Sequence, residues 1–90
     1  MPMRAVTVTT AVTEIADYNP QRVAFALQNN GTVRVFVSHD AVNVLSQGWP
    51  VDPGVMLSFS VADGDQPWLR FFAQTATGSA ELRIYEGFSR

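Results

Sequence analysis

Hydrophobic and polar side chains alternate along two neighbouring stretches of the chain, residues 23–27 and residues 33–38. In the first, Val, Phe and Leu alternate with two alanines, and in the second three valines alternate with Arg, Phe and Ser. A period of two is the pattern of a strand that buries one face. Asn29-Asn30-Gly31 lies between them, and Asn and Gly readily adopt the positive φ of tight hairpin turns. The pattern predicts a β-hairpin across residues 19–39.

Similar alternation and β-branched residues predict four further strands, at residues 4–10, 55–61, 68–75 and 79–86. Residues 11–18 fit either an irregular segment or a second edge strand. No segment of helical length shows a period of 3.6. Short strands separated by turn residues indicate an all-β fold, a small antiparallel β-sandwich or barrel, with a jelly roll among its variants. We expect one domain over residues 1–90, with residues 19–87 as its core and residues 1–10 as an N-terminal strand or arm.

Residues 40–54 lose this periodicity and are predicted to form loops and turns. Val42, Val44 and Leu45 are expected to anchor the loop against the sheet. Pro53-Gly54 suits the two central positions of a type II turn, because proline fixes a negative φ and glycine accepts a positive one.

The composition points to a protein partner. Charged residues make up only 16% of the 90 residues, well under the usual fraction of about 25%, so part of the surface is expected not to face water. The net charge of −2 argues against nucleic acid or an anionic membrane, because both favour an excess of Lys and Arg. No apolar run reaches the roughly 18 residues that span a bilayer. A chain of this size also buries a thin core, which favours self-association.

Three predicted strands carry the same pattern of Arg, apolar residue and aromatic residue. The middle residue of each is in phase with the core, so the Arg and the aromatic residue share the opposite face of the strand. If the three strands are neighbours, these side chains form one patch, flanked by the small residues Ala24 and Ala26. The tripeptides are Arg34-Val35-Phe36, Arg70-Phe71-Phe72 and Arg83-Ile84-Tyr85.

This patch allows three interpretations. In the first, the aromatic rings fill a second layer of a thin sandwich and the Arg stems lie over its rim. In the second, the patch is a protein–protein interface, because Arg and aromatic residues are enriched at hot spots. The third is a platform for single-stranded nucleic acid, against which the acidic net charge and the absence of Lys argue. Trp49, in a loop rich in Gly and Pro, is either a further interface anchor or a lid over one end of the core.

Catalytic and metal sites are not expected. The chain has no Cys, which excludes disulfides, thiolate metal sites and a Cys nucleophile. His39-Asp40 lacks a third partner and is interpreted as a hydrogen-bonding pair at a strand end. Asp63-Gly64-Asp65 lacks the later ligands of a calcium loop and is interpreted as a solvated turn. We therefore expect no catalytic, cofactor-binding or metal-binding residues and no enzymatic activity.

Several segments, taken together, resemble a known family. Asn19-Pro20-Gln21-Arg22 precedes an apolar strand that ends in Gln28-Asn29-Asn30-Gly31. Residues 48–54 then read Gly-x-x-Val-x-Pro-Gly, and residues 80–87 read Ala-Glu-Leu-Arg-Ile-Tyr-Glu-Gly. In this order the segments resemble small virion structural proteins of tailed bacteriophages, of the capsid decoration (cement) or head-fibre-base type. The resemblance covers residues 19–87.

The resemblance implies an all-β protein without cofactor or catalysis that binds the assembled capsid in many copies and stabilises it. Its partners would be the major capsid protein or another virion protein, and its copies would form a homo-oligomer, with a trimer favoured. Synthesis would take place in the host cytoplasm and the final location would be the virion. A neck, tail or fibre-base position is the first alternative, and a β-barrel that binds single-stranded nucleic acid is the second. Residues 1–10 could add a strand to a neighbour's sheet, although an ordinary strand of their own sheet is the favoured interpretation.

Overall fold

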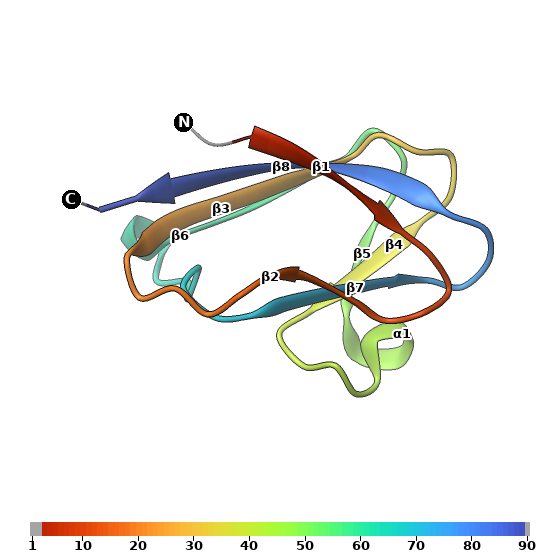
Figure 1. Ribbon diagram of the computed structural model, residues 1–90, viewed down its shortest axis with the longest axis horizontal. Coiled ribbons are helices and arrows are strands. Elements are labelled where there is room, and N and C mark those ends of the chain that lie inside the picture. The colour runs from red at the N-terminus through yellow and green to blue at the C-terminus, as the bar shows by residue number, and fades with distance from the viewer. Residues whose placement is uncertain (1–2, 90) are drawn as a thin grey trace.

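Two four-stranded antiparallel sheets pack face to face in the computed structural model, which describes residues 3–89 (Figure 1). The first sheet has the order β1 (Met3–Val8), β8 (Ala80–Phe88), β3 (Arg22–Asn29) and β6 (Met56–Ser60). The second has the order β2 (Thr13–Ala16), β7 (Phe71–Thr75), β4 (Val35–Ser38) and β5 (Trp49–Val51). A short helix, α1 (Val44–Gln47), and a 3₁₀ turn, η1 (Val61–Asp63), complete the elements of the described residues. The predicted all-β fold is confirmed, as a sandwich.

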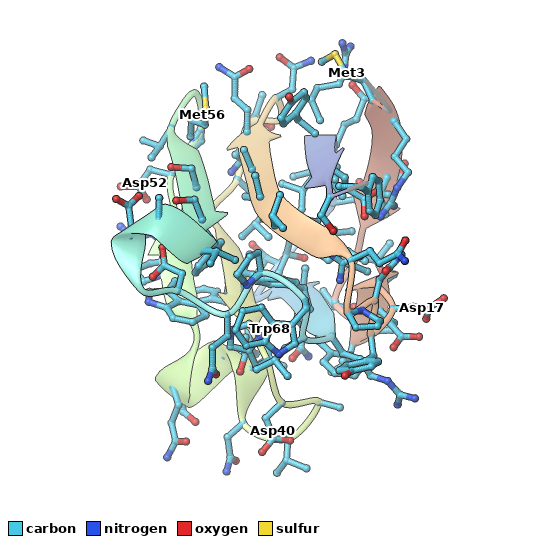
Figure 2. All side chains as sticks on the ribbon, turned by 90° about the vertical axis from the view of Figure 1, so that its left-hand side faces the viewer. Met3, Asp17, Asp40, Asp52, Met56 and Trp68 are labelled. Atoms are coloured by element: carbon cyan, nitrogen blue, oxygen red, sulfur yellow. The ribbon has the colours of Figure 1, made fainter. Side chains whose placement is uncertain are left out.

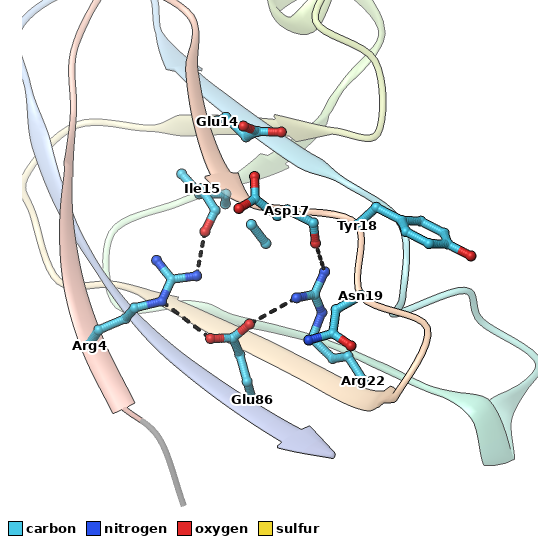
Figure 3. A pocket seen from close by; sticks show the side chains of 9 residues that line it. Arg4, Glu14, Ile15, Asp17, Tyr18, Asn19, Arg22 and Glu86 are labelled. Atoms are coloured by element: carbon cyan, nitrogen blue, oxygen red, sulfur yellow. Dashed lines mark hydrogen bonds and ion pairs between the residues drawn. The ribbon is translucent and has the colours of Figure 1, made fainter. Parts of the chain in front are cut away.

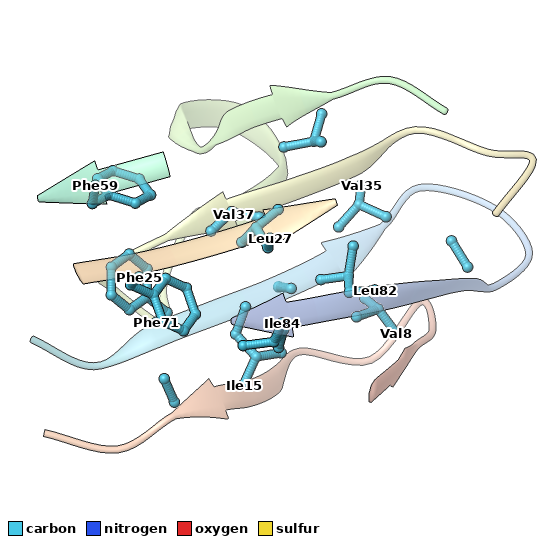
Figure 4. Close-up of a cluster of buried hydrophobic side chains, with 14 residues drawn as sticks. Val8, Ile15, Phe25, Leu27, Val35, Val37, Phe59, Phe71, Leu82 and Ile84 are labelled. Atoms are coloured by element: carbon cyan, nitrogen blue, oxygen red, sulfur yellow. The ribbon is translucent and has the colours of Figure 1, made fainter. Parts of the chain in front are cut away.

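The core lies between the two sheets and is built from the alternating residues of both (Figure 4). Phe25 of the first sheet stacks on Phe71 of the second, with ring centroids 4.2 Å apart. The predicted phase of β3 is correct for Phe25 and Leu27 but wrong for Val23, which is 37% exposed. The register of β3 against β8 shifts between Arg22 and Ala24, and this irregularity turns Val23 outward while Arg22 is buried.

The predicted hairpin at residues 19–39 is wrong, because β3 and β4 lie in different sheets. The side chain of Asn29 is fully buried and organises the crossing. Its Oδ1 accepts a hydrogen bond from the Gly31 N–H at 2.9 Å, and its Nδ2 donates to the carbonyls of Val33 and Val51 at 2.8 and 2.9 Å. Asn30 and Gly31 do not adopt the positive φ of a tight hairpin turn. Residues 30–34 therefore connect the two sheets, and Asn30-Gly31 belongs to this connection and not to a hairpin turn.

The predicted turn at Pro53-Gly54 is confirmed. Gly54 has a φ of 84°, and the N–H of Val55 donates to the carbonyl of Asp52 at 3.0 Å. The preceding loop is more ordered than its pattern predicts, because it contains α1 and β5. Of the three expected loop anchors only Val44 is buried, whereas Val42 and Leu45 are exposed.

Helix α1 covers part of the outer face of the second sheet, on the side away from the first sheet (Figure 1). Val44 is 1% exposed, yet it does not belong to the cluster between the sheets. The helix contacts β4 and β7, and Gly48 follows it against the backbone of β4, where an added Cβ would lie 2.8 Å from the Val37 carbonyl oxygen. No helix of the described residues covers the outer face of the first sheet (Figure 1).

The N-terminal segment forms an ordinary strand of its own sheet. β1 pairs with β8 in an uninterrupted register from Met3↔Tyr85 to Val8↔Ala80. It lies at the edge of the first sheet, with β8 as its sole neighbour among the described strands.

Candidate functional site

The six Arg and aromatic side chains of the predicted patch divide between the two outer faces of the sandwich. The middle residues Val35, Phe71 and Ile84 are buried, as predicted. However, β4 and β7 are neighbours in the second sheet, whereas β8 belongs to the first. The expectation of one patch from all three strands is therefore wrong. Strand order depends on contacts between distant parts of the chain, which the tripeptides do not encode.

On the second sheet, Phe36 and Phe72 are diagonal neighbours. Phe36 lies opposite Gln74, and Phe72 lies opposite Ser38. Both rings are half-buried, on the same side of the sheet as helix α1. Their exposure is thus higher than that of a second core layer and lower than that of a fully exposed interface patch.

The two Arg side chains of this face are already paired. Arg34 Nε lies 2.5 Å from Asp52 Oδ1, and Arg70 Nε lies 3.5 Å from Glu14 Oε2. The four side chains are between 36% and 63% exposed, so each pair adds little stability. The pairs do neutralise the positive charge that a nucleic-acid platform would use.

On the first sheet, Tyr85 and Arg83 lie on the outer face, hereafter the open face. Met3, Tyr85, Ala26 and Ser58 form one row across all four strands. The next row is Ala5, Arg83, Gln28 and Met56. Met3 and Met56 project from the same side of the sandwich at the two edges of this sheet (Figure 2). Of the two alanines expected to flank the patch, Ala26 lies directly opposite Tyr85 and Ala24 lies opposite Gly87.

The open face carries almost no net charge. Among the outward residues of β1, β8, β3 and β6, the charged ones are Glu81 and Arg83, and Arg83 Nε donates to Glu81 Oε1 at 2.9 Å. This hydrogen bond, together with one from the Asn30 side chain, holds the pKa of Glu81 below its ordinary value of 4.5. A shallow hollow of about 100 Å³ lies between Met3, Met56 and Tyr85. Apart from the pair of Glu81 and Arg83, the outward side chains of the open face are uncharged, and they include large, small, apolar and polar residues.

Trp49 lies over one end of the core, as one of its two interpretations predicts, and its role as an interface anchor stays a prediction. Its side chain is 41% exposed, yet it packs edge-on against Phe59 and His39, with ring centroids 5.1 and 5.5 Å apart. Phe59 belongs to the first sheet and Trp49 to the second. The indole therefore closes the gap between edge strands β5 and β6 and leaves its outer part accessible.

The His39-Asp40 pair has the predicted strand-end geometry. His39 Nδ1 lies 2.9 Å from the carbonyl oxygen of Arg70. Asp40 Oδ1 accepts a hydrogen bond from the N–H of Val42. The two side chains thus bond to backbone groups of different segments. No group of three or more His, Cys, Asp or Glu side chains within residues 3–89 is arranged to hold a metal ion.

A buried ionic cluster, which the sequence pattern did not reveal as a unit, lies at the other open flank of the sandwich (Figure 3). Glu86 accepts hydrogen bonds from Arg22 Nη1 at 3.0 Å and from Arg4 Nε at 3.2 Å. Arg4 Nη2 also donates to the carbonyl of Ile15 in β2. Arg22 is 2% exposed, and its other donors reach backbone carbonyls of Asp17, Pro67 and Leu69.

This cluster holds the two sheets together. Arg4, Arg22 and Glu86 belong to the first sheet. The carbonyls that the two arginines reach lie in β2, directly after β2 at Asp17, or on the segment that leads into β7 of the second sheet. A cavity of about 500 Å³ opens beside them between β1 and β2, with Glu14 and Asp17 in its lining. The alternation along the strands could have revealed the pair of Arg4 and Glu86. Glu86 continues the series of core residues Leu82 and Ile84, and Arg4 is in phase with Val6, two residues later. A carboxylate and a cation in core phase on neighbouring strands predict a buried pair.

Known proteins offer no further guide. No family model matches the chain, and neither the curated proteins nor the solved structures contain a match to it. Within residues 3–89, no helix is long and apolar enough to cross a membrane.

Proposed function

We propose that this protein is a non-enzymatic structural component of a tailed-bacteriophage virion, a capsid decoration or cement protein that binds the assembled shell in many copies. Its partner is the major capsid protein or another virion protein. The resemblance of residues 19–87 to such proteins suggests the role, and a homo-oligomer, with a trimer favoured, accompanies it. A neck, tail or fibre-base position is the alternative within the same particle.

The open face carries the proposal. It spans all four strands of the first sheet, lacks a covering helix and presents one charge pair among otherwise uncharged side chains. Apolar and aromatic surface with few charges is the composition of interface cores. Tyr85 and Met56 supply large apolar side chains, and Ala26, in the same row as Tyr85, leaves room for close approach.

The arginines favour a protein partner over nucleic acid. All five Arg residues of the described chain lie in ion pairs, with Glu86, Asp52, Glu14 or Glu81. A nucleic-acid site needs cations that can neutralise phosphates, and binding then falls steeply as salt rises. Salt-sensitive retention on single-stranded DNA would support the nucleic-acid alternative, and its absence would exclude it.

The test is binding to the particle. Labelled protein is mixed with intact heads of the phage that carries its gene, with isolated tails, and with dissociated capsid subunits, and each mixture is sedimented. Saturable binding of many copies to heads, with weak binding to subunits, is expected because a cement protein recognises the assembled state. Binding to tails alone would favour the neck or tail alternative. Binding to none of them would overturn the proposal.

A further inference from the structure

The two sheets have four edge strands, of which two are protected against pairing with another chain along their length and a third, β6, is protected at its end. β5 has three residues and contains Pro50, which lacks a backbone N–H. β2 has four residues and an irregular register between Glu14 and Ala16. At β6, the N–H of Ser60 is already bonded to Asp65 Oδ2, and Asp63 lies beside it. Short length, proline, irregularity and nearby charge are the usual means of protecting an edge.

β1 has none of these protections between Met3 and Val8. It is the longest of the four edge strands, with six residues, and its register against β8 is uninterrupted. Its only charged residue, Arg4, turns inward to Glu86 and to the Ile15 carbonyl. The charge of Arg4 therefore does not protect the exposed edge of β1 from pairing. A row of backbone donors and acceptors along β1 remains available for another strand.

We propose that β1 pairs with β1 of a second copy of this chain, antiparallel about a two-fold axis centred on Val6, so that the two first sheets become one continuous sheet. This inference replaces the trimer that the resemblance favours with a two-fold dimer. Its test measures association in solution, so its failure is distinguishable from a failure of the proposed virion role.

The side chains of β1 select this register. A two-fold axis perpendicular to the sheet places outward residues opposite outward residues. Centring on Val6 sets Val6 against its counterpart, Ala5 against Thr7 of the other copy, and Arg4 against Val8 of the other copy. Centring on Ala5 would bring the two Arg4 side chains closer together, and like charges on facing strands are unfavourable. Val6, which is half-buried in one copy, becomes covered by its counterpart.

The partner is a second copy because the pairing satisfies both edges at once. A two-fold contact uses the same strand on both sides and closes without leaving β1 free. The open faces of the two copies then join side by side. A trimer, by contrast, would need a contact between two different surfaces.

The experiment is a charge cycle on the outward residues of β1, read as solution mass by sedimentation equilibrium over a range of concentrations. Ala5→Glu/Thr7→Glu places like charges opposite each other twice across the axis. Ala5→Glu/Thr7→Lys places opposite charges there, and within one copy it also sets the introduced glutamate opposite Arg83 and the introduced lysine opposite Glu81. Met56→Glu/Ser58→Glu is the matched control, with the same charge change at the other edge of the sheet.

We expect a mass twice that of the 9.9 kDa chain for the wild type, the control and the Glu/Lys variant. For the Glu/Glu variant, the dissociation constant should rise at least about tenfold. A monomeric wild type, a trimer, or a dimer that the Glu/Glu variant leaves intact would overturn the proposal. If the Glu/Glu variant does not fold, amide exchange on the wild type decides. Alternate β1 amides gain protection with concentration if the edge is the interface, and continued fast exchange of those amides in a dimer would overturn it.

Discussion

Arg22 donates a hydrogen bond of 3.0 Å to Glu86 inside the sandwich. The two residues lie on neighbouring strands of the first sheet, β3 and β8. The same guanidinium reaches the carbonyls of Pro67 and Leu69 at 2.7 and 3.0 Å, on the segment that leads into β7 of the second sheet. One buried cation therefore links three segments that are far apart in sequence.

Replacing Glu86 by Gln should destabilise the protein by about 3 kcal/mol, because removing one partner of a buried pair leaves the other charge uncompensated. This value lies at the low end of the usual cost of breaking a buried ion pair, because Arg22 keeps its carbonyl acceptors. Urea unfolding measures it, as a lower midpoint with an unchanged slope.

Asp52→Asn is the matched control for that measurement. It removes the carboxylate of an ion pair with Arg34 in which both side chains are more than half exposed. Exposed pairs contribute little, so a change within about 0.5 kcal/mol is expected. Equal effects of the two substitutions would show that the interior cluster does not fasten the sheets.

Gly31→Ala should destabilise the fold by about 1–3 kcal/mol, the usual cost of overpacking. An added Cβ at Gly31 would lie 2.6 Å from the Ala80 Cβ and 2.8 Å from its Cα, so the backbone must shift. This contact exists because residues 30–34 cross between the sheets beside the start of β8.

Ala80→Gly tests that contact directly. In the double variant, the clash with the Ala80 Cβ is gone, and the loss of stability should fall short of the sum of the two single losses by about 1 kcal/mol. Additive losses would mean that Gly31 and Ala80 are not in contact, as would hold for a hairpin turn facing solvent. Both values come from urea unfolding of the four proteins in the cycle.

Residues 30–34 also show where prediction from the sequence ends. Alternation correctly placed Phe25, Leu27, Val35 and Val37 in the core, because the phase of a strand is a local property. The pairing of the strands was wrong because it is decided by the buried Asn29 amide. One of its acceptors, the carbonyl of Val51, lies 22 residues away in sequence. A local turn signal cannot encode such a partner.

For the candidate site, too, the sequence predicted the direction of the side chains but not the order of the strands. That Arg83 and Tyr85 face outward followed from their phase in the strand, whereas the position of Ala26 beside Tyr85 depends on the pairing of β3 with β8. Their separation from Phe36 and Phe72 follows from the strand orders of the two sheets, which only the folded structure supplies. The ionic cluster could be predicted in part, since Glu86 and Arg4 are both in phase with core residues.

The carboxyl group of Glu81 should titrate below its ordinary pKa of 4.5, because Arg83 and Asn30 bond to its charged form. Its contribution to stability is therefore present above pH 4.5 and is lost as the pH falls through the lowered pKa. NMR titration of the side-chain carboxyl carbon measures this, and Arg83→Ala should return the pKa toward 4.5. An unchanged pKa in that variant would assign the shift to another group.

Tyr85→Ala and Phe36→Ala separate the two outer faces. Both side chains are half-buried, so each substitution should cost about 2 kcal/mol, roughly half the loss for a core aromatic. The circular dichroism spectrum should remain that of the folded protein, in each single variant and in the double variant. In sedimentation with phage heads, we expect Tyr85→Ala to weaken binding at least about tenfold, as a central aromatic anchor does. Phe36→Ala should weaken it less, because α1 lies on that face of the second sheet. The reverse order of effects would move the shell contact to the second sheet, and a double variant that unfolds would place both rings in the core.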